Sequence, residues 1–283
     1  MPRLRVVVLT GGAMIAFAGN SILCRLALRD DTIDPASFTS IRLASGALAL
    51  LAILFVSRRR ASLRSSGSWL SALALFSYAI FFSYAYITLS AGTGALILFG
   101  FVQATMIAIG LALGDRPGLT AWLGWLIAVG GLVWLVLPGV EAPQPGGAML
   151  MAAAGIAWGI YSIRGRTESD ALAATTSNFV LSIAFVVALT AVTLAAAELS
   201  PQGIMIAIVS GALTSGVGYV IWYAALDDLT PMQAALVQLS VPAIATAGGV
   251  VLLDEPLSAR LLVASALVLG GISVALSRRT GRA

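Results

Sequence analysis

The stretch Trp69–Gly114, WLSALALFSYAIFFSYAYITLSAGTGALILFGFVQATMIAIGLALG, decides the fold, because none of its residues is charged. A helix of about 20 apolar residues crosses the ~30 Å hydrocarbon core of a bilayer. This stretch is too long for one crossing and predicts two, Trp69–Ser90 and Ala91–Gly114. The small residues Ser90-Ala91-Gly92-Thr93-Gly94 mark the turn between them.

The same apolar character extends over the whole chain of 283 residues, of which 59% are hydrophobic and 10% charged. An average soluble domain has roughly 25% charged residues, so the composition indicates an all-α integral membrane protein. The length allows about ten crossings and leaves no room for a soluble domain. The other eight expected spans are Val6–Leu28, Pro35–Ser57, Leu119–Leu137, Gly146–Ile163, Ala171–Ala197, Gln202–Leu226, Met232–Leu253 and Leu257–Leu276.

Arginine supplies all 16 basic residues, and the net charge is +4. Cytoplasmic loops of membrane proteins carry excess Arg, which explains the charge without a nucleic-acid partner. Most arginines fall in alternate loops, so we predict that both termini are cytoplasmic and expect no nucleic acid. This set is Arg3, Arg5, Arg58, Arg59, Arg60, Arg64, Arg116, Arg164, Arg166, Arg278, Arg279 and Arg282.

An internal repeat organises the ten spans. Gly11-Gly12-Ala13-Met14 recurs as Gly146-Gly147-Ala148-Met149, and Leu113–Pro117 (LGDRP) resembles Leu252–Pro256 (LLDEP). We therefore expect two related five-helix halves, residues 1–140 and 141–283. Because five is odd, the second half enters the membrane from the opposite side. Inverted repeats of this kind place a substrate site near the midplane between the halves, which predicts a transporter that works by alternating access.

Chemistry-bearing residues are scarce in the apolar spans. The chain has no histidine, no lysine and one cysteine, Cys24, so a disulfide within the chain and thiolate metal sites are excluded. The acidic residues lie in loops or at span ends, which leaves no intramembrane carboxylate for exchanging protons with cationic drugs. We expect no catalytic residues, no metal and no cofactor, and a neutral or zwitterionic small-molecule substrate.

Polar side chains within the spans are candidates for binding that substrate. Asn20, Gln103, Gln238 and Ser240 can hydrogen-bond an amino acid, although polar side chains also join helices to one another. Arg42 lies about eight residues inside its span. It could bind a carboxylate, snorkel to the interface or pair structurally with Asp30, Asp31 or Asp34.

Aromatic side chains offer flat apolar walls for an aromatic substrate. Trp158 lies midway along its span and is the first candidate, followed by Phe99 and Tyr78, with Tyr161 and Tyr219 nearby in sequence. The span-end residues Trp69, Trp122, Trp222 and Tyr223 fit an interfacial aromatic belt instead. Pro242, Gly216 and Gly218 are candidates for helix flexing, with static packing as the alternative.

Several short motifs are spread along nearly the whole chain. They are Asn20-Ser21, Arg25, Pro35, Arg42, Ser90–Leu96, Ala157–Tyr161, Tyr223–Leu226, Leu239–Pro242 and Leu252–Pro256. Together they resemble the EamA family of the drug/metabolite transporter superfamily, although the fourth span lacks a proline equivalent to Pro242. Within that family they are most similar to bacterial inner-membrane exporters of aromatic amino acids of the YddG type. The resemblance implies amino-acid export; alternatives are export of other amphipathic metabolites or drugs, and a non-transporting receptor or scaffold.

Overall fold

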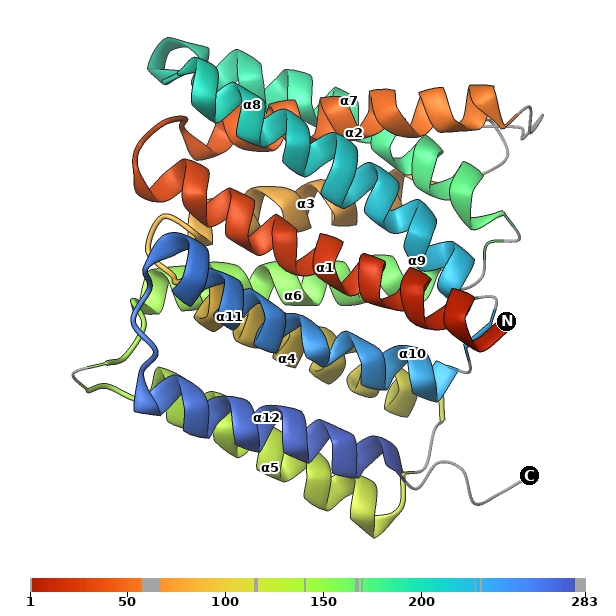
Figure 1. Ribbon diagram of the computed structural model, residues 1–283, viewed down its shortest axis with the longest axis vertical. Helices are drawn as coiled ribbons and strands as arrows, with labels where there is room; N and C mark the ends of the chain where they lie inside the picture. Colours follow the sequence, from red (N-terminus) through yellow and green to blue (C-terminus); the bar gives the residue numbers. More distant parts are fainter. Residues whose placement is uncertain are drawn as a thin grey trace.

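The computed structural model describes residues 2–57, 67–114, 117–139, 141–165, 168, 170–226, 228–229 and 231–277. In this part of the chain, ten helical spans lie side by side with their axes roughly aligned, and consecutive spans run in opposite directions (Figure 1). Nine of them have the length and hydropathy of membrane spans, and the tenth, Trp69–Ala85, is a shorter apolar helix. The all-α membrane fold with ten crossings is thereby confirmed.

The first half contains five unbroken helices: α1 Pro2–Arg29, α2 Pro35–Val56, α3 Trp69–Ala85, α4 Ala91–Ala112 and α5 Leu119–Val136. The apolar stretch divides at the expected place. Ser90 caps α4 by accepting a hydrogen bond from the Thr93 amide. The third span ends earlier than the expected Ser90, because the chain leaves the helix after Ala85 to form the turn.

The second half contains two irregular spans. Its regular helices are α6 Pro145–Gly165, α7 Ala171–Thr193, which runs into the short η1 Leu194–Ala196, and α12 Ala259–Ser277. The eighth span is continuous but changes winding: α8 Pro201–Val209, the π-helix η2 Ser210–Val217, then α9 Gly218–Leu226. The ninth span is broken into α10 Pro231–Gln238 and α11 Ser240–Leu253.

The break in the ninth span lies at Leu239, three residues before Pro242. Proline has no amide hydrogen, so it cannot donate to the carbonyl of Gln238 one turn earlier. The corresponding helix of the first half, α4, has no proline and runs unbroken. The two halves therefore bend differently, as the missing proline indicates.

The two halves are inverted with respect to each other. Helix α1 begins at the end of the array where α12 finishes, whereas α6 begins at the opposite end (Figure 1). The contacts between helices show the same relation. Helix α6, which begins the second half, packs against α3 and α4. Its equivalent in the first half, α1, packs against α9 and α11, which belong to the spans equivalent to α3 and α4. The equivalent helices α2 and α7, α4 and α11, and α5 and α12 pack on each other. This pattern confirms two inverted five-helix repeats.

Small residues allow the closest of these approaches, between α5 and α12. A Cβ atom on Gly271 would lie 2.5 Å from the Gly124 carbonyl oxygen and 2.6 Å from the Ala128 amide nitrogen. Only glycine permits backbones to pack at this distance, as is common between membrane helices.

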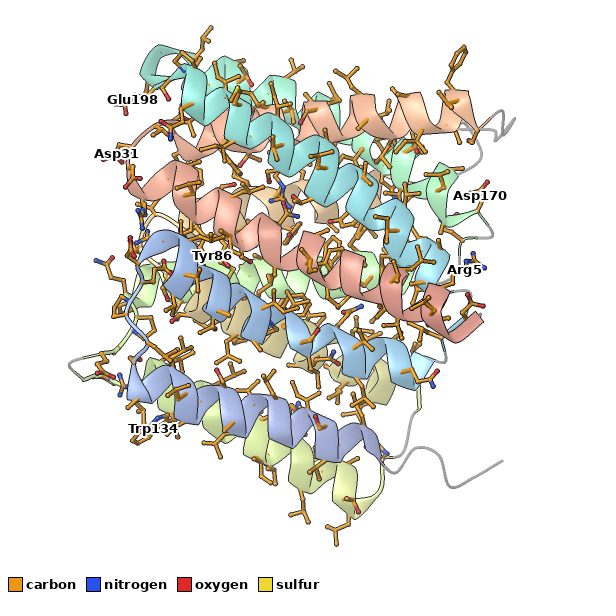
Figure 2. The ribbon with its side chains drawn as sticks, viewed as in Figure 1. Arg5, Asp31, Tyr86, Trp134, Asp170 and Glu198 are labelled. Atoms are coloured by element: carbon orange, nitrogen blue, oxygen red, sulfur yellow. The ribbon has the colours of Figure 1, made fainter. Side chains whose placement is uncertain are left out.

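The array has two chemically distinct ends. We call the end that carries Arg5 and Asp170 the terminus end, and the end that carries Asp31 and Glu198 the far end (Figure 2). Several residues used for the orientation prediction and the repeat lie outside the described residues, namely Arg58, Arg59, Arg60, Arg64, Asp115, Arg116, Arg166, Arg278, Arg279 and Arg282.

Candidate functional site

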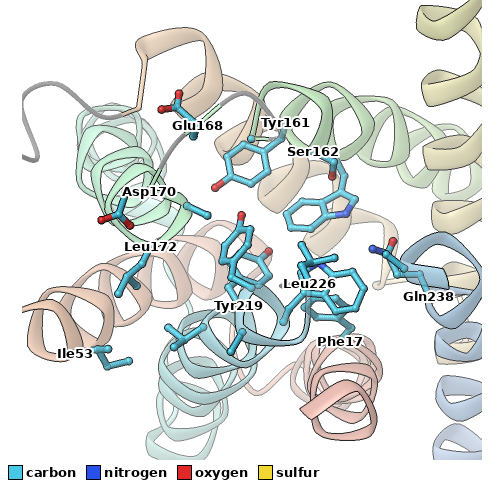
Figure 3. Close-up of a pocket in the computed structure, with 18 of the residues that line it drawn as sticks. Phe17, Ile53, Tyr161, Ser162, Glu168, Asp170, Leu172, Tyr219, Leu226 and Gln238 are labelled. Carbon is cyan, nitrogen blue, oxygen red and sulfur yellow. The ribbon is translucent and has the colours of Figure 1, made fainter. Parts of the chain in front are cut away.

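A cavity of about 880 Å³ lies between the two halves, and Figure 3 shows residues that line it. It reaches the terminus end, because Asp170 is among its lining residues. Its walls come from α1, α2 and α4 of the first half and from α6, α7, α9 and α10 of the second. Five of the predicted substrate-binding residues line this cavity, namely Gln103, Trp158, Tyr161, Tyr219 and Gln238. The inverted fold therefore brings together side chains that are distant in the sequence.

An aromatic cluster forms the deep wall of this cavity. The Trp158 ring is stacked on Tyr161, with centroids 5.3 Å apart, because residues three apart share one face of α6. The same indole contacts Tyr219 of α9 at 5.3 Å and Tyr78 of α3 at 4.8 Å. Trp158 therefore lies at the junction of three helices from both halves.

Behind this cluster lies a second cavity, of about 20 Å³. Trp158, Tyr219 and Phe17 line both cavities, so these rings separate the two spaces. Three further expected residues contribute to the inner space, namely Asn20, Tyr78 and Phe99. The small cavity has room for about one water molecule and lies on the other side of these rings from the large one.

Asn20 joins α1 to the π-helix. Its side-chain oxygen accepts hydrogen bonds from the hydroxyls of Ser210 at 2.8 Å and Thr214 at 2.7 Å. Its amide nitrogen donates to the Ser215 hydroxyl at 3.2 Å. The wider π-helical turn places these three hydroxyls around a single amide, and π-helical turns are often found at functional sites.

Arg42 continues this network on α2. The guanidinium donates through Nε to the Ser215 hydroxyl at 3.2 Å and through one terminal nitrogen to the Tyr78 hydroxyl at 3.1 Å. Its carbon lies 5.3 Å from the centre of the Tyr78 ring and 5.0 Å from that of Phe82. The other terminal nitrogen, Nη1, is buried and has no hydrogen-bond partner among the described residues.

Two expectations about Arg42 were wrong. The side chain does not snorkel to the interface, because the residue is only 2% exposed. Asp30 and Asp34 are not its partners either: Asp30 pairs with Arg29, and Asp34 caps α2. Within the described chain, no carboxylate, that of Asp31 included, lies within 4 Å of the guanidinium. The arginine is held by hydroxyls and rings that are all neutral.

The remaining candidates are more peripheral. Ser240 donates to the carbonyl of Val237 across the break between α10 and α11, and it lines neither cavity. Pro242 is buried in the first turn of α11. Gly216 and Gly218 lie in or beside the π-helix, where an added Cβ atom would lie 3.2 Å from Ala49 and 2.9 Å from Ala16 respectively. These glycines allow the eighth span to pack against α2 and α1.

The interfacial-belt interpretation of Trp222 and Tyr223 was wrong. Both side chains line the large cavity; Trp222 is 8% exposed, and the Tyr223 hydroxyl accepts a hydrogen bond from Thr175. Their position near a span end suggested a belt, but the cavity reaches that end of the membrane. Trp69 and Trp122, which are 58% and 39% exposed, have the exposure expected of belt residues.

The sequence interpretation also missed several cavity residues. Phe17 contacts Tyr219 and Trp222 edge to face. Glu168 and Asp170 lie on one side of the cavity, opposite Gln238 (Figure 3). Nothing in the local pattern distinguishes Phe17 from an ordinary packing residue. The two acidic residues belong to the loop before α7, where a carboxylate also suits the helix cap that Asp170 provides.

The far end is closed by contacts between the halves. Arg25 of α1 pairs with Glu255 beyond α11, with Nε and Oε1 3.2 Å apart, and donates to the carbonyls of Tyr86 and Ile87. The other Glu255 oxygen accepts a hydrogen bond from the Ala91 amide, which is at the start of α4.

A second set of backbone contacts closes the same end beside α2. Ile33 forms an antiparallel bridge with Leu199. The Asp34 amide donates to the Glu198 carbonyl at 3.1 Å, and the Ser200 amide donates to the Thr32 carbonyl at 3.0 Å. The structure therefore has a cavity at one end and contacts that join its two halves at the other.

Inverted repeats with a cavity between the halves are typical of membrane transporters. The model of the EamA-like transporter family matches the chain twice, over residues 4–137 and 145–277. The chain belongs to this family: it is a multi-pass membrane transporter of a small-molecule substrate, and not an enzyme.

Known proteins of similar sequence come from bacteria. An uncharacterized protein of Pseudomonas aeruginosa is 52% identical over all of this chain and 98% of its own length. The uncharacterized transporter YoaV of Bacillus subtilis is 20% identical over 85% of this chain and 86% of its own. A crystal structure shares the fold with a TM-score of 0.63, at 19% identity, over 95% of this chain and 99% of the other.

Proposed function

We propose that this transporter exports amino acids, including aromatic ones, across the bacterial inner membrane by alternating access. The observation that supports this most strongly is the cavity wall, where Trp158 contacts Tyr78, Tyr161 and Tyr219. Aromatic walls favour a flat apolar side chain, with ring pairs contributing about 0.5–1.5 kcal/mol each. The uncharged amides of Gln103 and Gln238 suit the polar end of a zwitterion.

The proposed orientation places both termini in the cytoplasm, in line with the arginine distribution. In that orientation the large cavity faces the cytoplasm, and the contacts between Arg25 and Glu255 close the periplasmic side. An exporter takes its substrate from this side. The proposed binding residues are those that line the two cavities, with Asn20 and Phe99 in the inner one.

Counterflow into proteoliposomes tests the proposal. Vesicles that contain the purified protein are loaded with unlabelled phenylalanine, tryptophan, threonine or methionine, and entry of the labelled amino acid is measured. We expect accumulation above that of protein-free vesicles, with the aromatic amino acids preferred. Absence of counterflow for all four amino acids would refute amino-acid transport, and counterflow of other amphipathic metabolites or drugs would then identify the alternative.

A further inference from the structure

Arg42 is a buried charge that no carboxylate of the described residues pairs with. The residue is 2% exposed and lies in the first half of α2, where its guanidinium contacts the neutral groups of Ser215, Tyr78 and Phe82. A buried charge is costly unless it is paired, and such residues in membrane spans usually mark substrate or ion pathways. The part of the chain that the structure describes offers it no carboxylate.

The surroundings of Arg42 are ordered in a way that suits an anion. The hydroxyl of Ser215, which also belongs to the Asn20 network, holds Nε, and the hydroxyl of Tyr78 holds one terminal nitrogen. These two bonds fix the plane of the guanidinium and leave Nη1 unbonded. A planar guanidinium fixed in this way is suited to binding a carboxylate through its N–H groups.

Two aromatic rings, those of Tyr78 and Trp158, lie between this charge and the large cavity. Tyr78 contacts the guanidinium on one side and the Trp158 ring, at 4.8 Å, on the other. Tyr78 and Phe82 also line the inner cavity, which shares Trp158 and Tyr219 with the outer one. Arg42 itself lines neither cavity, so a substrate can reach it only if these rings move aside.

The opposite side of the large cavity carries negative charge. Glu168 and Asp170 line it towards the terminus end, across from Gln238 (Figure 3). The cavity therefore has a cation beyond its deep wall and two carboxylates near its entrance. This polarity orients a zwitterion with its carboxylate inward and its ammonium outward, and it disfavours a purely cationic substrate at the deep end.

We propose that Arg42 binds the carboxylate of the substrate, so that the transporter selects aromatic and apolar carboxylates over their uncharged or cationic analogues. This deepens the proposed function, on which it rests for the location of the substrate cavity. Asn20 and Ser215 act as positioning residues that hold the guanidinium, while the aromatic rings close over the bound carboxylate.

Binding to paired ligands tests this inference. The full-length protein in lipid nanodiscs is titrated with phenylalanine and phenylalaninol, which has an alcohol in place of the carboxylate, and with phenylacetate and phenylacetamide. We expect the wild type to bind each carboxylate about tenfold or more tightly than its partner, since charge-assisted hydrogen bonds are the strong ones. Comparable affinities within both pairs would overturn the proposal.

Variants assign the preference to the residue. Arg42→Gln should bind the two members of a pair with affinities that differ by no more than about twofold. Arg42→Lys keeps the positive charge but loses the planar guanidinium, and it should retain a partial preference for the carboxylate. Arg5→Gln removes an arginine that is paired at the surface with Asp228 and should keep the full preference. A preference that persists undiminished in Arg42→Lys and Arg42→Gln contradicts the role of Arg42; if Arg42→Gln does not fold, Arg42→Lys alone decides.

The two proposals fail differently. If phenylalanine is neither bound nor transported but phenylacetate is preferred over phenylacetamide in an Arg42-dependent way, amino-acid export is wrong and the carboxylate site stands. If phenylalanine is transported while phenylalaninol binds equally well, the carboxylate site is wrong and amino-acid transport stands.

Discussion

Substitution of Glu255 by Gln should open the far end of the transporter. Glu255 bridges three segments there, pairing with Arg25 at 3.2 Å and accepting the Ala91 amide at 2.9 Å. Gln has the same shape and can still accept from that amide, so the substitution removes the negative charge and little else. The contact joins the first half to the second, and its loss therefore weakens the closed arrangement relative to one that is open at the far end.

The size of the effect follows from burial. The side chains of Arg25 and Glu255 are 19% and 10% exposed, so water screens this pair much less than a surface pair. Hydrogen bonds that involve a charged group contribute about 1.5–3 kcal/mol. Part of this remains in the variant, so we expect the equilibrium to shift by about 1–2 kcal/mol, which is roughly 5- to 30-fold in the ratio of the two states.

Spin labels across the far end measure this shift. Ile87 and Leu257 are both exposed there, on the turn before α4 and on the segment before α12. With Cys24 replaced by Ala, labelled Ile87→Cys and Leu257→Cys should give one main distance by double electron–electron resonance, and Glu255→Gln should add a longer one.

The matched control is Asp30→Asn, which removes a carboxylate from the more exposed Arg29–Asp30 pair at the same end. Exposed pairs contribute about 0–1 kcal/mol, so the distance distribution should stay nearly unchanged. Identical distributions in the wild type and Glu255→Gln would refute the assignment of this pair to closure of the far end.

Two further predictions concern packing and the cavity. Trp158→Ala should weaken the binding of tryptophan about tenfold, because aromatic contacts are lost, and should weaken the binding of threonine less. Isothermal titration calorimetry measures both affinities. Equal losses of affinity for the two amino acids would contradict the role of the ring. Gly211→Ala should lower the thermal unfolding midpoint, because its Cβ atom would overlap the Arg42 carbonyl. Gly130→Ala, whose added Cβ meets nothing within 4 Å, is the control and should not lower it.

The fold was largely predictable from local properties of the chain. Charge-free runs such as Trp69–Gly114 determine where the chain crosses the membrane. These runs form helices, because a helix satisfies the backbone groups that would be costly to leave unpaired in hydrocarbon. The break near Pro242 and the unbroken α4 likewise follow from one residue that cannot donate a hydrogen bond. The π-helix at Ser210–Val217 was not predicted, since its winding depends on packing against α1 and α2.

The sequence indicated which kinds of side chain could bind a substrate, but not which of them lie together around one cavity. Gln103 and Gln238 stood out because amide side chains are rare in these spans, and Trp158 stood out because it lies midway along its span. Phe17 and Trp222 did not stand out, because facing the cavity depends on how each helix is rotated against its neighbours. The rotation of α9 also explains why Trp222 and Tyr223 face the cavity and do not belong to the expected aromatic belt.

By itself, the sequence determined that this protein is a ten-span membrane protein with two inverted halves, because hydropathy, helix length and an odd number of spans per half are properties of the chain alone. Only the tertiary structure decided which end is closed and that no carboxylate of the described residues lies beside Arg42. Both depend on contacts between residues that are distant in the sequence, such as Arg25 with Glu255 and Arg42 with Ser215. Those contacts exist because helices from the two halves pack side by side.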